Sequence, residues 1–180
     1  MTKRKKLILL IIALALLALS YGALSSLRSN YKLGQELYLS SNDILHQVSN
    51  LMESIDYLEQ QFEDPNQNAD DVDRYFFDES IRTIRWNFGY ENMPLLDEVR
   101  LEWIHRFEEI YEQARSNETL QAMFDRGEHQ LLQEQFMQLA NLLTDFTDHY
   151  RDLPSRQHYL TSWSDIRERL SEQAGMVLEG

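Results

Sequence analysis

The residues from Leu7 to Leu24 are almost entirely apolar, carry no charge and directly follow four basic residues at positions 3 to 6. As an α-helix these eighteen residues would cover roughly 27 Å, close to the roughly 30 Å of hydrocarbon in a bilayer. After this stretch only Arg28 and Lys32 add basic charge before the first acidic residue. Because basic residues stay on the cytoplasmic side, we expect a single-pass signal-anchor with the N-terminus in the cytoplasm and the C-terminus outside.

A secretory signal peptide would begin in the same way, with a shorter apolar core such as Leu7 to Leu19 and small residues at a cleavage site. Ala18-Leu19-Ser20 and Ala23-Leu24-Ser25 both offer such small residues. Cleavage there would give a secreted helical protein. Apolar character resumes through Tyr21 and Leu27 without an intervening cluster of proline or glycine, which favours a retained anchor.

Apolar residues spaced alternately three and four positions apart predict one stripe along a helix. Two segments show this spacing over six positions: Ile44, Val48, Leu51, Ile55, Leu58 and Phe62, and then Leu132, Phe136, Leu139, Leu143, Phe146 and Tyr150. Shorter stripes predict helices over residues 77–88, 96–114 and 160–170, and no stretch alternates as a strand would. We therefore expect an all-α fold, with the membrane helix followed by an antiparallel bundle of four to six helices and a long first helix.

The expected organisation is a cytoplasmic basic tail at 1–6, the signal-anchor at 7–24, a juxtamembrane stalk at 25–40 and the helical bundle at 41–180. Helix boundaries are predicted from residues that end or begin helices. These are Asp64-Pro65-Asn66 at the end of the first helix, Pro94 and Pro154 at helix starts, Asn117 as a cap, and Gly127 as a break.

The chain is strongly acidic, with 17 basic and 30 acidic residues. Without the four basic residues before the apolar stretch, the remainder carries a net charge of −17. This charge excludes nucleic acid as an expected partner, makes anionic lipid surfaces poor partners, and leaves cations or basic protein faces. The chain has no cysteine, which fits a bacterial envelope protein better than a small disulfide-bonded secreted module.

The polar segment after the first helix has oxygen-bearing residues at alternate positions, as in a calcium-binding loop. The candidate calcium ligands are Asp64, Asn66, Asn68 and Asp70. Ala69 stands where such a loop needs glycine, and Tyr75 stands where it needs a bidentate glutamate. A polar turn between two helices is the preferred interpretation, and calcium is retained as the weaker candidate.

Catalytic and cofactor motifs are not found in the sequence. Glu102 and His105 form one Glu-x-x-His step of the kind used in di-iron bundles, but no second step exists, so His105 is expected on the surface. The chain has no glycine-rich phosphate loop, no nucleophile elbow and no zinc-ligand spacing. We expect a protein that is not an enzyme and holds no cofactor or metal.

Aromatic residues concentrate between positions 75 and 90 and fall on more than one face of their helix. They either fill a core or anchor a partner, and the candidate partner-binding residues are Trp86, Phe88 and Tyr90.

The leading hypothesis is a protein-binding accessory or assembly factor of the cell envelope. A small-ligand-sensing bundle that works with a separate signalling partner, and a cleaved secreted protein, are the alternatives. The stripe of the first helix also permits a homodimer.

Overall fold

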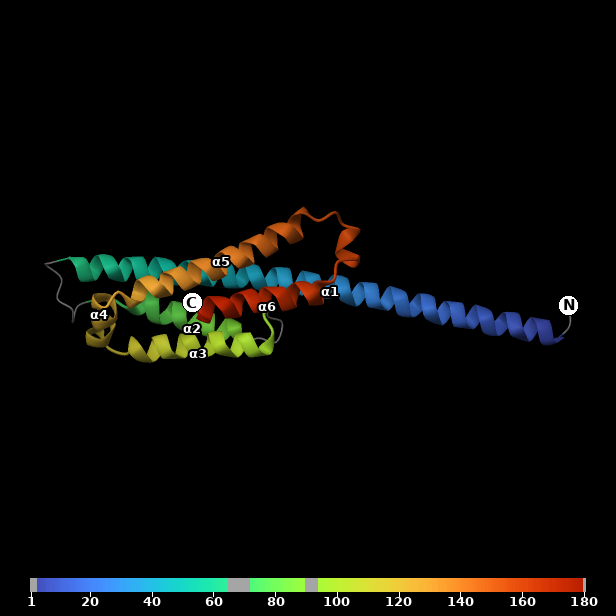
Figure 1. The fold of residues 1–180 in the computed structure, drawn as a ribbon, viewed down its shortest axis with the longest axis horizontal. Helices are drawn as coiled ribbons and strands as arrows, with labels where there is room; N and C mark the ends of the chain where they lie inside the picture. Colours follow the sequence, from blue (N-terminus) through green and yellow to red (C-terminus); the bar gives the residue numbers. More distant parts are fainter. Residues whose placement is uncertain (1–2, 65–71, 90–93, 180) are drawn as a thin grey trace.

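A computed structural model of the chain describes residues 3–64, 72–89 and 94–179, and within these residues it contains six α-helices, one short 3-10 helix and no strand (Figure 1). The prediction of an all-α fold is confirmed. The elements in chain order are α1 (Lys3–Glu63), α2 (Tyr75–Phe88), α3 (Asp97–Gln113), α4 (Asn117–Asp125), α5 (Glu128–Asp152), the 3-10 helix η2 (Gln157–Tyr159) and α6 (Trp163–Glu179).

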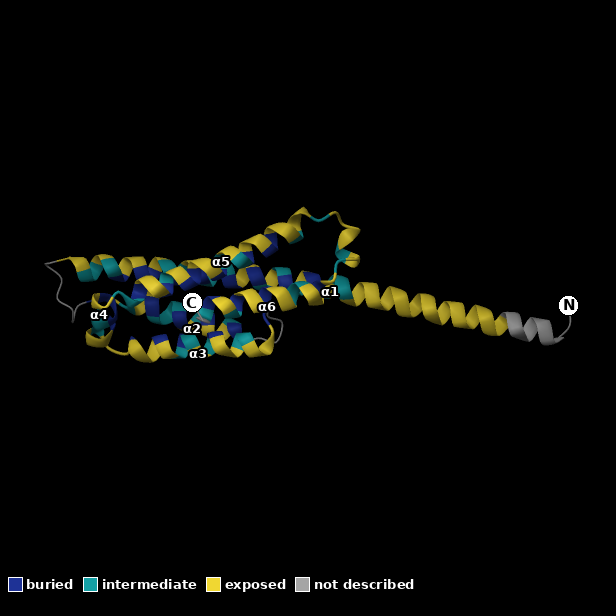
Figure 2. Ribbon diagram, in the orientation of Figure 1, coloured by how far each residue is buried: buried dark blue, intermediate teal, exposed yellow. Residues whose placement is uncertain are grey.

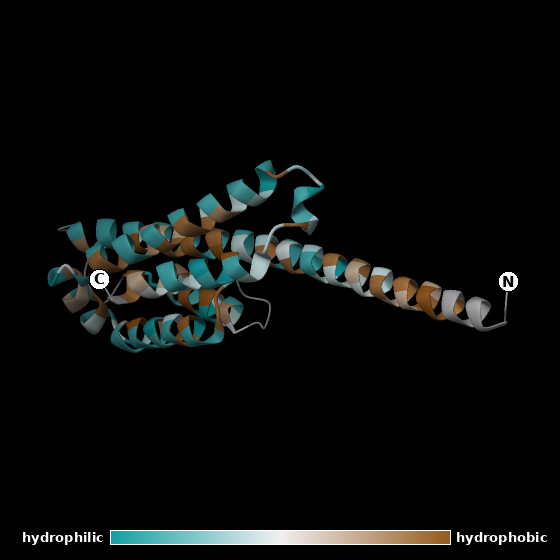
Figure 3. Ribbon diagram, turned by 45° about the vertical axis from the view of Figure 1, so that its right-hand side comes forward, coloured by the Kyte–Doolittle hydropathy of each residue, from teal (hydrophilic) through white to brown (hydrophobic). Residues whose placement is uncertain are grey.

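Helix α1 has 61 residues and is therefore about 90 Å long. Residues 10–29 are exposed on all sides and form the projecting arm in Figure 2. Figure 3 shows that hydrophobic residues recur along this arm toward the N-terminus. Within the described residues, α1 alone is long and apolar enough to cross a membrane, judged by length and composition, and its apolar window is not buried by other helices.

The second half of α1 forms the core with the other helices. It packs against α2 and α5 along its length, α3 packs on α2, and α6 lies between α5 and α3 (Figure 1). Both predicted stripes point inward, since the residues from Ile44 to Leu58 and from Leu132 to Leu143 in these stripes are at most 2% exposed. The last residue of each stripe, Phe62 and Tyr150, is only partly buried because it lies near the end of its helix. We call the described residues between 30 and 178 the helical body.

The helical body begins earlier in the chain than the expected boundary at residue 41. Gly34 and Leu37 are already buried, although they fall within the expected stalk of residues 25–40. The reason is that Gly34 has no side chain and lets the indole of Trp163 lie directly against the backbone of α1.

Several helix boundaries lie close to the predicted ones. Helix α1 ends at Glu63, and Gly127 separates α4 from α5 with a left-handed φ of 72°, which favours glycine. The cap of α4 is Ser116 and not Asn117. The Ser116 hydroxyl accepts a hydrogen bond from the backbone N–H of Thr119 at 3.2 Å, while the Thr119 hydroxyl accepts one from the Ser116 N–H at 3.1 Å.

The predicted starts at Pro94 and Pro154 are wrong. Helix α3 begins at Asp97, and α6 begins at Trp163 after an irregular segment that contains η2. Trp163, the first residue of α6, is buried in the core against Gly34 of α1. Pro154 instead follows the end of α5.

Candidate functional site

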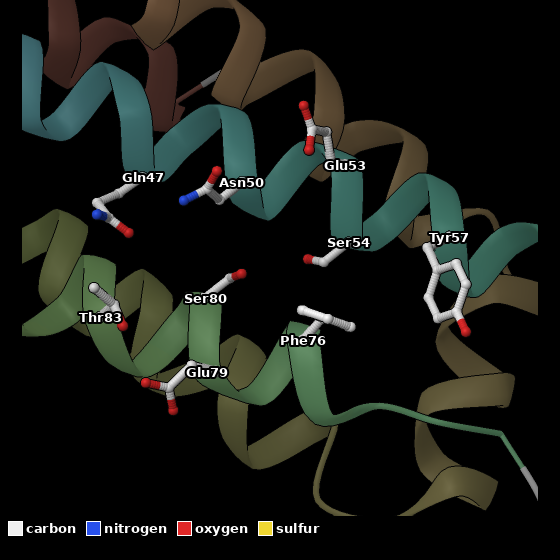
Figure 4. Close-up of a pocket in the computed structure, with 9 residues that line it drawn as sticks. All are labelled: Gln47, Asn50, Glu53, Ser54, Tyr57, Phe76, Glu79, Ser80 and Thr83. Carbon is white, nitrogen blue, oxygen red and sulfur yellow. The ribbon is translucent and has the colours of Figure 1, made fainter.

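A groove runs between α1 and α2 and has a volume of about 530 Å³ (Figure 4). We call it the α1–α2 groove. Helix α1 contributes Gln47, Asn50, Glu53, Ser54 and Tyr57, and α2 contributes Phe76, Glu79, Ser80 and Thr83.

The groove exists because short polar residues flank the apolar stripes where the two helices meet. Leu51 and Ile55 of α1 are buried in the core, as are Ile81 and Ile84 of α2. The adjacent seam carries serine, threonine and amide side chains that are too short to fill the space beside this contact. In Figure 4 Asn50 and Ser54 of α1 face Ser80 of α2 across the gap, so the groove offers hydroxyl and amide groups for hydrogen bonds.

One end of the groove is aromatic. Tyr57, Tyr75 and Phe76, which we call the aromatic cluster, are all exposed, and Phe76 keeps 62% of its surface accessible. The Phe76 ring lies edge-on to Tyr57 at 6.5 Å and to Tyr75 at 5.9 Å between ring centroids. Exposed apolar patches of this kind mark binding surfaces, and aromatic residues are the commonest anchors in protein interfaces.

A further exposed aromatic residue, Trp86, lies on the same side of α2 as Phe76. Phe76, Glu79, Thr83 and Trp86 are spaced three, four and three residues apart, which places them on one side of the helix. Trp86 is 69% exposed and lines a smaller cavity together with Arg82. Because ten residues separate Phe76 from Trp86, the two aromatic ends lie about 15 Å apart along α2.

The three predicted partner-binding residues have different outcomes in the structure. Trp86 is exposed, as the prediction requires, and Tyr90 lies outside the described residues. Phe88 is 0% exposed, with its ring centroid 5.1 Å from that of Phe107, so it is a core residue and cannot form part of an exposed contact. Its burial follows from the apolar stripe of α2, which Phe88 completes.

The aromatic cluster is not among the partner-binding residues predicted from the sequence. Phe76 and Tyr75 lie off the apolar stripe of α2, and this was the available signal that they point outward. Tyr57 likewise lies off the stripe of α1, between Ile55 and Leu58. Residues that are aromatic and out of register with the core stripe identify this surface better than aromatic density alone.

The calcium candidates are placed only in part. Asp64 is exposed just after α1, whereas Asn66, Asn68 and Asp70 lie outside the described residues. Among the residues that the structure describes, no group of three or more histidine, cysteine, aspartate or glutamate side chains is arranged to hold a metal ion. His105 is on the surface as predicted, and its Nδ1 lies 3.3 Å from a carboxylate oxygen of Glu108.

The charges around α2 are mostly paired. Glu79 forms an ion pair with Arg82, and Arg85 lies 3.1 Å from Glu108 of α3. Asp78 is half-buried at the start of α2, and this burial raises the pKa of its carboxyl, while the nearby Arg74 guanidinium opposes the rise. Of these charged residues, only Glu79 lines the α1–α2 groove.

The α1–α2 groove and the projecting apolar arm of α1 are the two features from which a function can be inferred. Comparisons with protein-family models, with curated proteins and with solved structures find no match to this chain.

Proposed function

We propose that this chain is a single-pass membrane protein of the bacterial envelope, with a cytoplasmic N-terminus, and that its extracytoplasmic helical bundle binds another protein as an accessory or assembly factor. In this proposal the protein is not an enzyme. The observation that supports it most directly is the exposed aromatic cluster at the end of the α1–α2 groove.

The groove suits a segment of a protein partner. Phe76 and Trp86 supply two exposed aromatic anchors about 15 Å apart, a length that a helix covers in about ten residues. The hydroxyl and amide groups between them can bond the polar groups of a bound segment and thereby set its orientation. Because the chain beyond its apolar stretch carries a net charge of −17, a basic partner face would associate fastest.

The arm of α1 supports the membrane anchor. Its residues 10–29 are exposed, so packing against the helical body does not account for their apolar character. The basic residues at positions 3 to 6 would hold the N-terminus in the cytoplasm. Measuring the intact mass of the native protein tests this part, because cleavage after Ser20 or Ser25 would remove the first 20 or 25 residues.

A small polar ligand is the second candidate for the groove. Its volume of about 530 Å³ falls within the range of roughly 300 to 1,000 Å³ that ligand pockets occupy. Glu53 would favour a cationic ligand, and Glu79 would do so in competition with its ion pair to Arg82. A protein of this kind would pass its signal to a separate partner.

Photo-crosslinking in intact cells of the source organism tests the protein-binding proposal. A benzophenone amino acid replaces Phe76 in the full-length chain, and the matched control carries it at Met137, which is 49% exposed on α5. We expect one discrete adduct from position 76 and none from position 137. A Tyr57→Ala substitution should weaken that adduct, because it removes the neighbouring anchor.

Equal crosslinking from both positions would show that contact with the groove is unspecific and would overturn the proposal. The absence of an adduct from position 76, together with a rise in melting temperature when spermidine is added to the purified full-length protein, would support the small-ligand candidate instead. Substituting Glu53 and Glu79 with glutamine should then abolish that rise.

A further inference from the structure

The segment of residues 153–162 lies at the end of the helical body from which the arm of α1 projects (Figure 1). We call it the membrane-proximal loop. The side-chain amide of Asn30 donates hydrogen bonds to the backbone carbonyls of Tyr159 at 3.1 Å and Thr161 at 2.6 Å. The ring of Tyr31 stacks on that of Tyr159 at 4.7 Å between centroids. These contacts fix the loop to α1 at residues 30 and 31.

The loop also contacts α5 and α6. The indole N–H of Trp163 donates a hydrogen bond to the carbonyl of His158 at 2.8 Å, and the His158 ring packs against Tyr150 at 4.4 Å. Trp163 itself is buried. The loop therefore keeps a defined position relative to the arm.

This position corresponds to the headgroup layer of a bilayer that contains the arm. The apolar stretch of α1 runs to Leu24, and Leu27 is the last apolar residue before Arg28, the first charged residue after the stretch. Asn30, which holds the loop, follows Leu27 by three residues, or about 4.5 Å along the helix. The polar layer on each side of the hydrocarbon is roughly 5 to 8 Å thick, so the loop lies at its depth.

The loop exposes apolar side chains at this depth. Leu160 is 75% exposed, and Tyr159 is exposed beside it. Tyrosine is enriched at membrane interfaces because its ring is apolar and its hydroxyl is polar. An exposed leucine on a loop that is otherwise held in place gains free energy by entering an interface.

The charge at this end differs from that of the whole chain. The loop carries Arg156 and no acidic residue, and Arg28 is exposed where the arm begins. Lys32 is paired with Glu36 at 3.2 Å, and the exposed Asp152 and Asp165 flank the loop. Arg28 and Arg156 are therefore the groups at this end that suit anionic headgroups, although the net charge of the chain disfavours anionic lipid.

We propose that the membrane-proximal loop is a second membrane contact, in which Tyr159 and Leu160 enter the headgroup layer of the leaflet from which α1 emerges, while Arg156 faces lipid phosphates. The inference rests on the proposed membrane anchor. With the arm inserted, this contact fixes the tilt and the rotation of the helical body about α1 relative to the membrane.

Site-specific labelling tests the contact, and the cysteine-free sequence makes it direct. Single cysteines at Leu160, Leu17 and Leu131, all exposed, carry a fluorophore in the full-length protein reconstituted in vesicles of phosphatidylcholine and phosphatidylglycerol. Lipids with a nitroxide quencher on the headgroup or on the acyl chain report depth. We expect headgroup quenching at position 160, acyl-chain quenching at position 17, and neither at position 131 on the body.

The three labels separate the two proposals. If position 17 is not quenched, the membrane anchor fails. If position 17 is quenched and position 160 is quenched no more than position 131, the anchor stands and the loop contact is refuted. We also expect Arg156→Glu to lower headgroup quenching at position 160 in these vesicles while position 17 is unchanged.

A lengthened arm gives an independent test. Inserting seven helix-forming residues between Ser25 and Ser26 raises the body by about 10 Å and turns it by only about 20°. Quenching at position 160 should then fall to the level of position 131, while position 17 keeps its quenching. Persistent quenching at position 160 in this variant would contradict the proposed contact.

Discussion

Replacing Gly34 with alanine should destabilise the helical body, although alanine normally favours a helix. A Cβ atom at this position would lie 2.5 Å from Nε1 and 2.7 Å from Cδ2 of Trp163. The indole is 0% exposed and donates its N–H to the carbonyl of His158, so it cannot move aside without breaking that bond. The added methyl group must therefore displace the ring or separate α6 from α1.

The magnitude follows from three opposing terms. Overpacking of a filled core costs about 1 to 3 kcal/mol, and loss of the indole hydrogen bond costs about 1 kcal/mol. Replacing a helical glycine with alanine stabilises the helix by up to about 1 kcal/mol. We expect Gly34→Ala to lower the free energy of unfolding by about 1 to 3 kcal/mol.

Gly175 provides the matched control, because it is also helical. A Cβ there would meet Val99 at 3.6 Å, an ordinary contact. Gly175→Ala should therefore raise the free energy of unfolding by about 0.5 to 1 kcal/mol. Urea unfolding of the full-length protein in detergent micelles, followed by far-UV circular dichroism, measures both changes.

A second substitution tests the cause. Trp163→Leu removes the indole, so Gly34→Ala should cost less in that background than in the wild type, with a coupling energy of about 1 kcal/mol or more. A Gly34→Ala protein that unfolds at the same urea concentration as the wild type, or at a higher one, would refute the proposed close packing of Trp163 on α1.

Three further outcomes test the fold. Phe107→Ala should lower the free energy of unfolding by about 3 to 5 kcal/mol in urea, because Phe107 is fully buried with its ring 5.8 Å from that of Phe136; exposed Phe76→Ala should change it by less than about 0.5 kcal/mol. Ser116→Ala should cost about 1 kcal/mol in the same assay through loss of the α4 cap, and no loss would contradict that role. Burial raises the pKa of Tyr150 above its usual value of 10.0, so the folded state keeps this phenol protonated after the unfolded state has ionised. The free energy of unfolding should thus fall as the pH rises past about 10, and it should fall less steeply in the Tyr150→Phe variant. Urea unfolding at about pH 9 and pH 11 measures both.

The helices of the fold were largely predictable because their apolar stripes are regular. The stripe from Ile44 to Leu58 faces the core as its spacing indicates, and local sequence also identified the break at Gly127. The start of α6 was not predictable in this way. It depends on Trp163 meeting Gly34, a contact between residues 129 positions apart, and a proline at position 154 was a misleading local signal.

The candidate site was predictable only in part, for a similar reason. Phe88 belongs to the spacing that buries Phe77, Ile81 and Ile84, so periodicity applied strictly would have placed it in the core. The same spacing excludes Phe76 from the buried stripe of α2 and so would have predicted that it is exposed. The groove itself could not be predicted, because it depends on which polar seam of α1 comes to lie beside α2.

One continuous helix carries both the apolar arm and the core stripe, and this sets the height of the groove in the proposed arrangement. The α1 residues that line the groove, from Gln47 to Tyr57, follow Leu27 by 20 to 30 residues, or about 30 to 45 Å of helix. A partner must therefore present its binding segment at that distance from the hydrocarbon. A single helix sets this height but leaves the body free to rotate about its axis. The membrane-proximal loop lies off that axis, so its contact with the headgroups would set the direction in which Phe76 and Trp86 face.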